Sequence, residues 1–384
     1  MPTWDLDQLS RQPASYPAPG FEEPGVEALF YEGLSWRGRG TRVFAWYGRP
    51  SAADKKVPAM VLVHGGGGTA FAAWVRHWTA RGYAAIAMDT CGCTAGGTHG
   101  NRPRHALGGP PGWGGFDQLD EPIEDQWMYH AAASVMLART LLSSRPEVDA
   151  GRVGLTGVSW GAVLTCIVAG VDPRFRLAAH IYGCGFLGET WAERWKETGP
   201  ERKARWLALW DPSAYLARAA CPMLWVVGTD DIAFPIREVR KSYRLPRGPR
   251  TLVMPVHLKH GHEEGWAPRE IGAFADGILK GGVPLARVTG QGVSKGRAWA
   301  AFEAACPVRK AELNFTRDSG PWRERRWETV AADLDAAAGR TSAPEPEGAT
   351  QYYLNLFDDR GLLVSAEHVE RRPSAVGRQP SAMA

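Results

Sequence analysis

A serine lies between two glycines in the segment Gly157-Val158-Ser159-Trp160-Gly161. This segment follows a short apolar run at residues 152–156 and precedes a helix-compatible run at residues 162–169. A turn this tight between a strand and a helix tolerates almost no side chain at the flanking positions, and it exposes the central hydroxyl above the sheet. The pattern therefore predicts a nucleophile elbow with Ser159 as the nucleophile.

A run of glycines, His64-Gly65-Gly66-Gly67-Gly68, directly follows the strand-like residues 59–63. Glycines allow the backbone to approach a substrate closely because no Cβ stands in the way. We therefore expect an oxyanion hole formed by the backbone N–H of Trp160 and one N–H from Gly66 or Gly67. The alternative is a flexible turn with no chemical role.

Two adjacent aspartates compete for the role of the acid that orients a catalytic imidazole. They lie in Gly228-Thr229-Asp230-Asp231, which follows the buried-strand run at residues 223–227. An acid in a loop at the carboxyl end of a strand can reach across the top of the sheet. We favour Asp231 as this acid and interpret Asp230 as a loop or capping residue.

The candidate general bases are the two histidines of His260-Gly261-His262, after the strand-like run 251–256. We favour His262 and keep His260 as its main alternative. A His-x-His pair could also ligate a metal, but no cysteine or carboxylate cluster is spaced to complete such a site, so we expect no metal and no cofactor. His64, His130 and His257 are interpreted as structural.

The chain order is Ser159, Asp231, His262, and each residue follows a separate strand-like run. This order distinguishes one class of serine hydrolase fold from the others. In the resulting mechanism His262 takes the proton of Ser159, Asp231 holds the tautomer of His262, and Ser159 attacks an acyl carbon.

These motifs resemble those of the α/β-hydrolase superfamily, close to its acetyl xylan esterase, dienelactone hydrolase and prolyl-oligopeptidase-like branches. The segment His262-Glu263-Glu264-Gly265 is similar to the His-Glu sequence of acetyl-esterase relatives, with one extra residue before the glycine. The spacing Gly228…Asp231…Pro235 resembles their acid loop. The resemblance extends over roughly residues 26–282, and it implies the α/β-hydrolase fold, a serine mechanism and a preference for acetyl groups.

Composition is that of an ordinary globular chain: 384 residues, of which 44% are hydrophobic and 22% charged. A net charge of +4 without a Lys/Arg-dense run gives no reason to expect a nucleic-acid partner. No apolar run approaches the length of about 18 residues that a membrane span requires. The six cysteines are expected to be reduced. The first residues have neither a basic start nor an apolar core, so we expect a cytoplasmic protein without a signal peptide in this sequence, with a secreted origin as the alternative.

The alternation of strand-like and helical runs predicts an α/β fold with a mostly parallel, doubly wound sheet over residues 26–282. Residues 1–25, with five prolines, are expected to form an extended N-terminal arm. The runs 26–31 and 41–47 alternate like strands, and we expect an antiparallel pair from them at the edge of the sheet.

Two insertions interrupt this alternation, and we expect both to shape the substrate pocket. Residues 90–124 are rich in glycine and proline. Residues 183–218 are helical and charged, which predicts a helical cap. Tryptophans in these insertions could line an acyl or sugar site: Trp113, Trp191, Trp195 and Trp210. The alternative is that the tryptophans pack the cap onto the core. The pairs Trp191/Trp195 and Trp206/Trp210 are spaced i, i+4, so each pair shares one helix face.

Beyond residue 282 the pattern changes to short strand-like runs separated by turns, which predicts a small all-β sandwich over residues 283–371. Residues 312–316 with Trp322 and Trp327 resemble the Ig-like module that is appended to some α/β-hydrolases. We favour a clamp on one edge of the enzyme over a platform that binds carbohydrate or a partner. Residues 372–384 are polar and are expected to be a disordered tail.

The sequence thus predicts a serine hydrolase that cleaves short-chain carboxylic esters of a small molecule or carbohydrate through an acyl-enzyme. A prolyl-oligopeptidase-like peptidase remains open because it uses the same triad, and Glu189, Glu193, Glu263 or Glu264 could anchor a peptide amino terminus. A lactone or polyester substrate is a further alternative. A non-catalytic binding protein of the same fold is disfavoured because all triad members have candidates. The sequence does not predict the oligomeric state.

Overall fold

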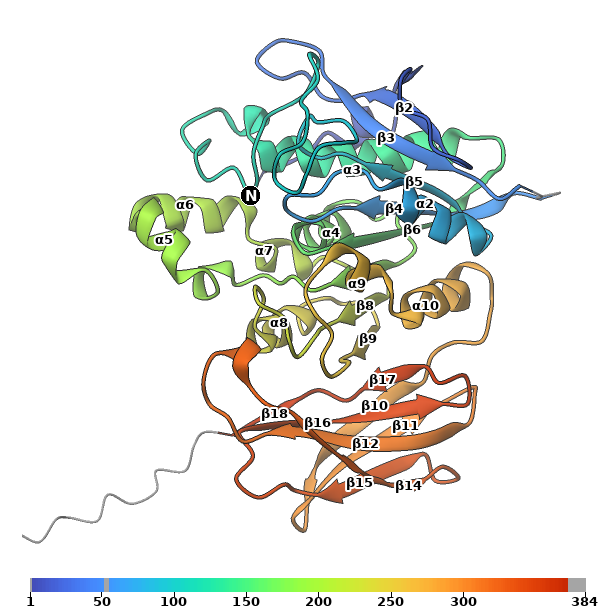
Figure 1. Cartoon of the computed structure of the whole chain (residues 1–384), viewed down its shortest axis with the longest axis vertical. Helices are drawn as coiled ribbons and strands as arrows, with labels where there is room; N and C mark the ends of the chain where they lie inside the picture. The colour runs from blue at the N-terminus through green and yellow to red at the C-terminus, as the bar shows by residue number, and fades with distance from the viewer. Residues whose placement is uncertain (1, 52–54, 372–384) are drawn as a thin grey trace, which may run out of the picture.

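A nine-stranded sheet forms the centre of the computed structural model, which describes residues 2–51 and 55–371 (Figure 1). The strand order is β1-β2-β3-β5-β4-β6-β7-β8-β9. The strands are β1 (Ser15–Pro17), β2 (Glu27–Glu32), β3 (Arg42–Gly48), β4 (Val57–Val63), β5 (Ala84–Met88), β6 (Val148–Val158), β7 (Ala178–Ile181), β8 (Met223–Val226) and β9 (Arg250–Val253).

The strands from β5 to β9 are all parallel, whereas β1, β2 and β3 join one edge in antiparallel pairs. The runs that form β4 and β5 are almost entirely apolar and almost entirely buried, as expected for strands covered on both faces. The α/β-hydrolase architecture predicted from the sequence is therefore confirmed.

Helices cover the sheet between successive strands. They are α2 (Ala72–Ala80), α3 (Trp127–Ser144), α4 (Trp160–Val171), α8 (Ile236–Tyr243), α9 (His262–Trp266) and α10 (Arg269–Leu279). Helix α3 is buried along most of its length, largely by apolar side chains, and it packs against α4 and against the central strands. Burial of these apolar faces stabilises the parallel core.

The N-terminal arm is more ordered than the proline-rich sequence suggests. It contains the short helix α1 (Leu6–Leu9), and its strand β1 extends the sheet beyond the predicted antiparallel pair. The Trp4 ring stacks on Tyr129 of α3 with a centroid separation of 5.1 Å. The prediction of a merely extended arm missed this packing because a single buried tryptophan carries no periodic signal.

The predicted cap is helical. It consists of the 3-10 helix η2 (Leu187–Glu189) and the helices α5 (Ala192–Thr198), α6 (Pro200–Trp210) and α7 (Ser213–Leu216). The other insertion, residues 90–124, is mostly irregular, with the 3-10 helix η1 (Ile123–Asp125) at its end.

The C-terminal part forms two antiparallel sheets that enclose a second small apolar core. One has the order β10-β11-β15-β14, and the other has the order β13-β12-β16-β17 with β18 paired to β16. Their bounds are β10 (Arg287–Ser294), β11 (Arg297–Glu303), β12 (Val308–Thr316), β13 (Glu328–Ala331), β14 (Asp333–Asp335), β15 (Arg340–Pro344), β16 (Gln351–Asp358), β17 (Leu363–Ser365) and β18 (Val369–Glu370). A 3-10 helix, η3 (Trp322–Glu324), lies between β12 and β13. The sequence did not predict β14, β15 and β18.

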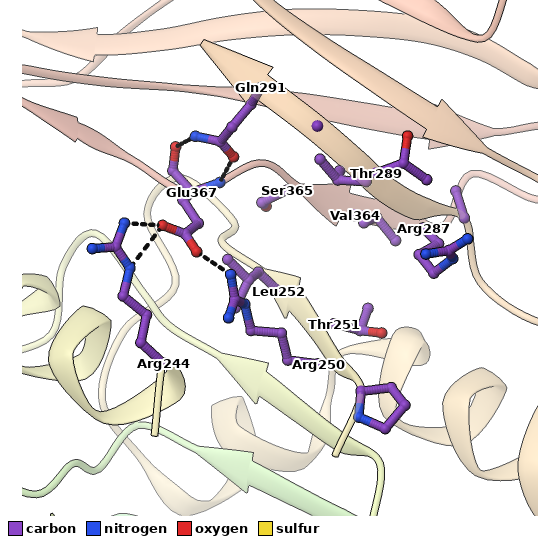
Figure 2. Close-up of a pocket in the computed structure, with 14 residues that line it drawn as sticks. Arg244, Arg250, Thr251, Leu252, Arg287, Thr289, Gln291, Val364, Ser365 and Glu367 are labelled. Carbon is purple, nitrogen blue, oxygen red and sulfur yellow. Dashed lines mark hydrogen bonds and ion pairs between the residues drawn. The ribbon is translucent and has the colours of Figure 1, made fainter. Parts of the chain in front are cut away.

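This β module lies beside β8 and β9, at the end of the large sheet (Figure 1). Figure 2 shows part of the joint, where Arg244 and Arg250 of the hydrolase form ion pairs with Glu367 of the module. The Gln291 side chain accepts a hydrogen bond from the Glu367 N–H at 2.6 Å and donates one to its carbonyl oxygen at 2.9 Å. These residues line a cavity of about 530 Å³ between the two parts.

The predicted tail, residues 372–384, lies outside the described residues. Within the described part of the chain, none of the helices is long and apolar enough to cross a membrane. All six cysteines lie in that part and are free, which agrees with the expectation of reduced thiols.

The buried histidines predict how stability depends on pH. Burial lowers the pKa of His180 in β7 from 6.5 to about 3 and that of His130 in α3 to about 4. The unfolded chain therefore binds protons that the folded protein excludes, so the free energy of unfolding should fall as the pH drops from about 6.5 towards 4. We expect His180→Leu to reduce the loss of stability between about pH 7.5 and about pH 5, measured by urea unfolding.

The matched control is His99→Leu, which replaces an exposed histidine. The prediction concerns the difference between wild type and variant because Asp89 acts in the opposite direction, with a pKa that burial raises from 3.8 to about 6. An unchanged pH dependence in His180→Leu would contradict it.

Candidate active site

Ser159 occupies a sharp turn between β6 and α4, as the motif predicts. Its backbone has φ 58° and ψ −119°, a left-handed conformation that is strained for a residue with a side chain. A Cβ at Gly157 would collide with the carbonyl oxygen of Gly161, and one at Gly161 would collide with that of Val63 in β4. Both glycines are therefore required by the close approach of α4 to the sheet.

His260 lies between Ser159 and Asp231. Its Nε2 is 3.0 Å from the Ser159 Oγ, and its Nδ1 is 3.0 Å from the Asp231 Oδ2. The Asp231 side chain is 1% exposed, and its Oδ1 accepts backbone hydrogen bonds from Ala233 at 2.7 Å and Phe234 at 2.8 Å. These bonds fix the carboxylate so that its other oxygen faces the imidazole.

The structure corrects the expectation that His262 contacts Ser159. The Nε2 of His262 instead accepts a hydrogen bond from the Gly65 N–H at 2.9 Å. Gly261 is fully extended, with φ −165° and ψ 170°, so the side chains of His260 and His262 point to the same side of the chain and both enter the site. Only the tertiary arrangement decides which one reaches the serine.

His262 is neutral in this environment. Burial is the main cause that lowers its pKa from 6.5 to about 4, and the nearby His64 and His99 lower it further. Its ring also packs on Phe71, with a centroid separation of 4.8 Å. His262 therefore supports the glycine loop as a neutral hydrogen-bond acceptor.

Asp230 faces away from the imidazole of His260. Its carboxylate lies 3.2 Å from the Nδ1 of His257, whose side chain is exposed. The structure thus brings Asp231, and not its neighbour, to the position that the acid of a triad requires.

The glycine loop lies directly beside the nucleophile. A Cβ at Gly65 would be 2.9 Å from the Ser159 Cβ, and one at Gly66 would be 2.9 Å from the Trp160 Cδ1. Trp160 is the first residue of α4, so its N–H has no acceptor within the helix. The Gly65 N–H is bound to His262, whereas Gly67 is turned towards His99 and its carbonyl oxygen accepts the Gly100 N–H. With the Gly65 N–H already bound, Trp160 and one of Gly66 and Gly67 stay the predicted N–H donors for an oxyanion.

Buried polar groups hold this loop from behind. The Nδ1 of His64 donates to the Gly65 carbonyl oxygen at 2.8 Å, and its Nε2 accepts the Thr90 N–H at 3.0 Å. Burial lowers the pKa of His64 to about 4, which keeps it in the neutral form that this pattern needs. Asp89, at the end of β5, accepts the N–H groups of Cys91 and Cys93 and thereby ties residues 90–124 to the sheet.

Aromatic side chains close one side of the site. Trp191 lies 5.1 Å from Trp160 and 5.6 Å from Phe234 between ring centroids, and Phe234 stacks beside His260 at 6.0 Å. Trp191 and Trp160 are only partly buried. Trp191 was predicted from the sequence, whereas Phe234 was not; its position three residues after Asp231 is the signal that could have identified it.

The other predicted substrate-binding tryptophans are placed differently. Trp210 is 0% exposed and donates to the Gln126 side chain, so it belongs to the core. Trp195 is 5% exposed and donates to the Leu187 carbonyl oxygen. Trp113 is half-buried and packs edge-on against His64 at 5.9 Å. The assignment of Trp195 and Trp210 to the substrate site is therefore corrected: both are packing residues.

Within the described residues, no group of three or more histidine, cysteine, aspartate and glutamate side chains is arranged to hold a metal ion.

Comparisons with known proteins agree with this architecture. Residues 20–189, which include the glycine loop and Ser159, match the family model for acetyl xylan esterase (AXE1). No curated protein sequence gives a match. The solved acetyl xylan esterase from Paenibacillus sp. R4 is similar to this chain with a TM-score of 0.57 and 22% identity, covering 72% of this chain and 92% of that one.

Two other solved structures illustrate the range of similar proteins. Acetyl xylan esterase 1 from Thermoanaerobacterium sp. JW/SL YS485 has a TM-score of 0.55 and 19% identity, covering 72% of this chain and 93% of that one. An acylaminoacyl peptidase in complex with Z-Gly-Gly-Phe-chloromethyl ketone has a TM-score of 0.50 and 17% identity, covering 67% of this chain and 41% of that one.

The chain has the α/β-hydrolase fold with a serine at its nucleophile elbow. The match of residues 20–189 to the acetyl xylan esterase model supports a serine hydrolase of carboxylic esters.

The geometry predicts losses of activity of very different size for the two histidines. His260→Asn should lower kcat by a factor on the order of a million, as loss of the triad base does elsewhere. His262→Ala should lower kcat by only about 10–100-fold because it acts through the glycine loop. His262→Gln, which keeps an acceptor, should recover part of that loss. Steady-state kinetics with p-nitrophenyl acetate measure all three variants, and a larger loss in His262→Ala than in His260→Asn would contradict the assignment.

Proposed function

We propose that this protein removes short acyl groups, acetyl foremost, from esters of a carbohydrate or another small alcohol through an acyl-enzyme on Ser159. The observation that carries the proposal is the continuous hydrogen-bonded chain from Ser159 through His260 to Asp231, with both links at 3.0 Å. Such a chain, on a strained elbow, is the arrangement that activates a serine hydroxyl.

In the proposed first step His260 accepts the Ser159 proton at Nε2 while the Ser159 Oγ attacks the acyl carbon. The Nδ1–H of His260 donates to Asp231, which stabilises the imidazolium that forms. The developing oxyanion is stabilised by the N–H groups of Trp160 and Gly66. His260 then gives its proton to the departing alcohol oxygen, and the acyl group stays on Ser159.

In the second step water takes the place of the alcohol. His260 removes a proton from the water, the resulting hydroxide attacks the acyl carbon, and the same two N–H groups stabilise the second oxyanion. Return of the proton to Ser159 releases the carboxylic acid.

Three aromatic side chains beside the triad, Trp160, Trp191 and Phe234, here called the aromatic wall, support a preference for short acyl groups. The rings of Trp160, Trp191 and Phe234 contact one another, Trp160 directly follows Ser159, and Phe234 lies beside His260. Rigid rings this near to the nucleophile favour a short acyl group over a long flexible chain. The match of residues 20–189 to the acetyl xylan esterase family also supports acetyl as the acyl group.

A peptidase is the second candidate, because an acylaminoacyl peptidase is among the similar structures. Its substrate would need an acidic anchor, for which the sequence offered Glu189, Glu193, Glu263 and Glu264. The Glu189 carboxylate is 2.6 Å from the Lys241 ammonium, so its charge is already compensated. The side chain of Glu193 lies outside the described residues, whereas Glu263 and Glu264 are exposed.

Replacement of the nucleophile tests the proposal. Ser159→Ala should reduce kcat on p-nitrophenyl acetate by a factor on the order of a million while leaving the melting temperature near that of the wild type. The assay should extend from acetate to octanoate and include aminoacyl and dipeptidyl p-nitroanilides.

Each outcome of this assay has a distinct meaning. Turnover of short esters that disappears in Ser159→Ala supports the esterase, and turnover confined to the anilides supports the peptidase. Wild-type protein that is silent on both, or ester turnover that survives in Ser159→Ala, would contradict the proposal.

The aromatic wall yields a prediction about chain length. Trp191→Ala should raise the ratio of kcat/KM for p-nitrophenyl hexanoate over acetate by about tenfold, because it opens space beside the serine. Trp299→Ala, which removes a partly buried ring on β11 of the module, is the matched control and should leave the ratio unchanged. Equal ratios in the two variants would show that Trp191 does not limit acyl length.

A further inference from the structure

The acid and the base of the triad both come from the weakly supported end of the sheet. Asp231 follows β8 and His260 follows β9, and these are the last two strands in the sheet order. Only β9, which leads to the base, is an edge strand, whereas β8 lies between β7 and β9; Ser159 follows β6, nearer the middle of the sheet. A loop that leaves an edge strand has fewer neighbours to fix it, so the orientation of His260 towards Asp231 requires support from outside the sheet.

The β module supplies this support to the loop that carries the base. Met254 directly follows β9, and its N–H donates to the Oγ of Ser365 at 2.8 Å. The side-chain amide of Asn355 donates to the Met254 carbonyl oxygen at 3.3 Å, and the Ser365 hydroxyl donates to Asn355 at 2.7 Å. Asn355 and Ser365 are each 2% exposed. Both backbone groups of Met254 are therefore held by buried side chains of the module.

The module also contacts the loop that carries the acid. The Nε1–H of Trp322 in η3 donates to the Gly228 carbonyl oxygen at 3.4 Å. Behind it Trp327 packs edge-on against Trp322 at 5.3 Å and against Tyr353 at 5.5 Å. Tyr353 is buried, and its raised pKa, which burial causes first and the Asp230 charge second, reflects how near the acid loop lies.

The two catalytic loops are in turn packed on each other. The His257 N–H donates to the Thr229 Oγ1 at 2.7 Å, and the Asp230 carboxylate lies 3.2 Å from the His257 ring. A Cβ at Gly228 would collide with the Leu258 carbonyl oxygen. A displacement of either loop is therefore transmitted to the other, and with it to the distance between Asp231 and His260.

The module itself is firmly attached to the hydrolase. Its residues Leu356, Leu363 and Val364 belong to the same continuous apolar core as the large sheet. The Leu363 N–H donates to the buried carboxylate of Glu270 in α10 at 2.8 Å, and the ion pairs of Glu367 lie at the same joint (Figure 2). Such an interface fixes the position of the module relative to the sheet, because closely packed side chains transmit strain instead of absorbing it.

We propose that the β module positions the active site: Asn355 and Ser365 hold the base loop through Met254, and Trp322 holds the acid loop through Gly228. The module thereby sets the hydrogen bonds from Ser159 to His260 to Asp231 without touching substrate. This inference rests on the triad of the proposed function.

The test compares two buried asparagines of the module. Asn355→Ala removes the contact with Met254, whereas Asn314→Ala removes an equally buried asparagine whose oxygen accepts only from Thr329 within the module. At a temperature where both variants are folded, Asn355→Ala should lower kcat on p-nitrophenyl acetate by about 10–100-fold with KM within about twofold. Asn314→Ala should keep kcat within about twofold of the wild type even if its melting temperature falls equally.

Variants at Trp322 and Ser365 keep the test decisive if Asn355→Ala fails to fold. Trp322→Phe keeps an aromatic ring but removes the N–H donor to Gly228, so it should lower kcat several-fold. Trp299→Phe should not lower kcat. Ser365→Ala should lower kcat, and Ser365→Thr, which keeps a hydroxyl, should recover it.

The rate at which a fluorophosphonate modifies Ser159 separates this inference from the proposed function, because the reagent reports activation of the serine without an ester substrate. Wild-type protein that does not react at Ser159 would contradict the proposed function itself. Wild-type protein that reacts, together with Asn355→Ala and Trp322→Phe that react as fast as their controls, would overturn the positioning role alone.

Discussion

The site depends on the close approach of α4 to β4 at the nucleophile elbow. No side chain fits at Gly161 because the carbonyl oxygen of Val63 occupies that space. This contact accompanies the left-handed conformation of Ser159 and places Trp160, the first residue of α4, beside Gly66. The strain at one residue is offset by the surrounding packing, since β4 and α4 are almost entirely buried.

The remaining parts of the site must be brought to that fixed point from elsewhere. The glycine loop follows β4, a central strand, and is held by His64 and His262. Asp231 and His260 follow the last two strands, and the loop of His260 leaves the edge strand β9, where the sheet alone supports it weakly. A second domain at that edge gives a physical reason for the size of the chain, because buried polar contacts replace the missing neighbouring strand.

The sequence predicted the parts of the fold that follow from periodicity and from glycine. Apolar runs identified the parallel strands, and the spacing around Ser159 identified the elbow. The sequence could not predict which of His260 and His262 contacts Ser159, because an extended Gly261 leaves both side chains on the same side of the chain. Nor could the sequence show that Trp191 lies at the site whereas Trp210 is buried in the core. Helical spacing shows which residues share a face but not what that face contacts. Short, exposed strands such as β14 carry no apolar signal at all.

The most direct measurement is the site of covalent modification by diisopropyl fluorophosphate, located by peptide mass spectrometry in wild-type protein and in the two histidine variants. We expect one modified residue, Ser159, with modification abolished in His260→Asn and retained, though slower, in His262→Ala. Modification at another residue, or modification that survives in His260→Asn and is lost in His262→Ala, would contradict the triad of Ser159, His260 and Asp231.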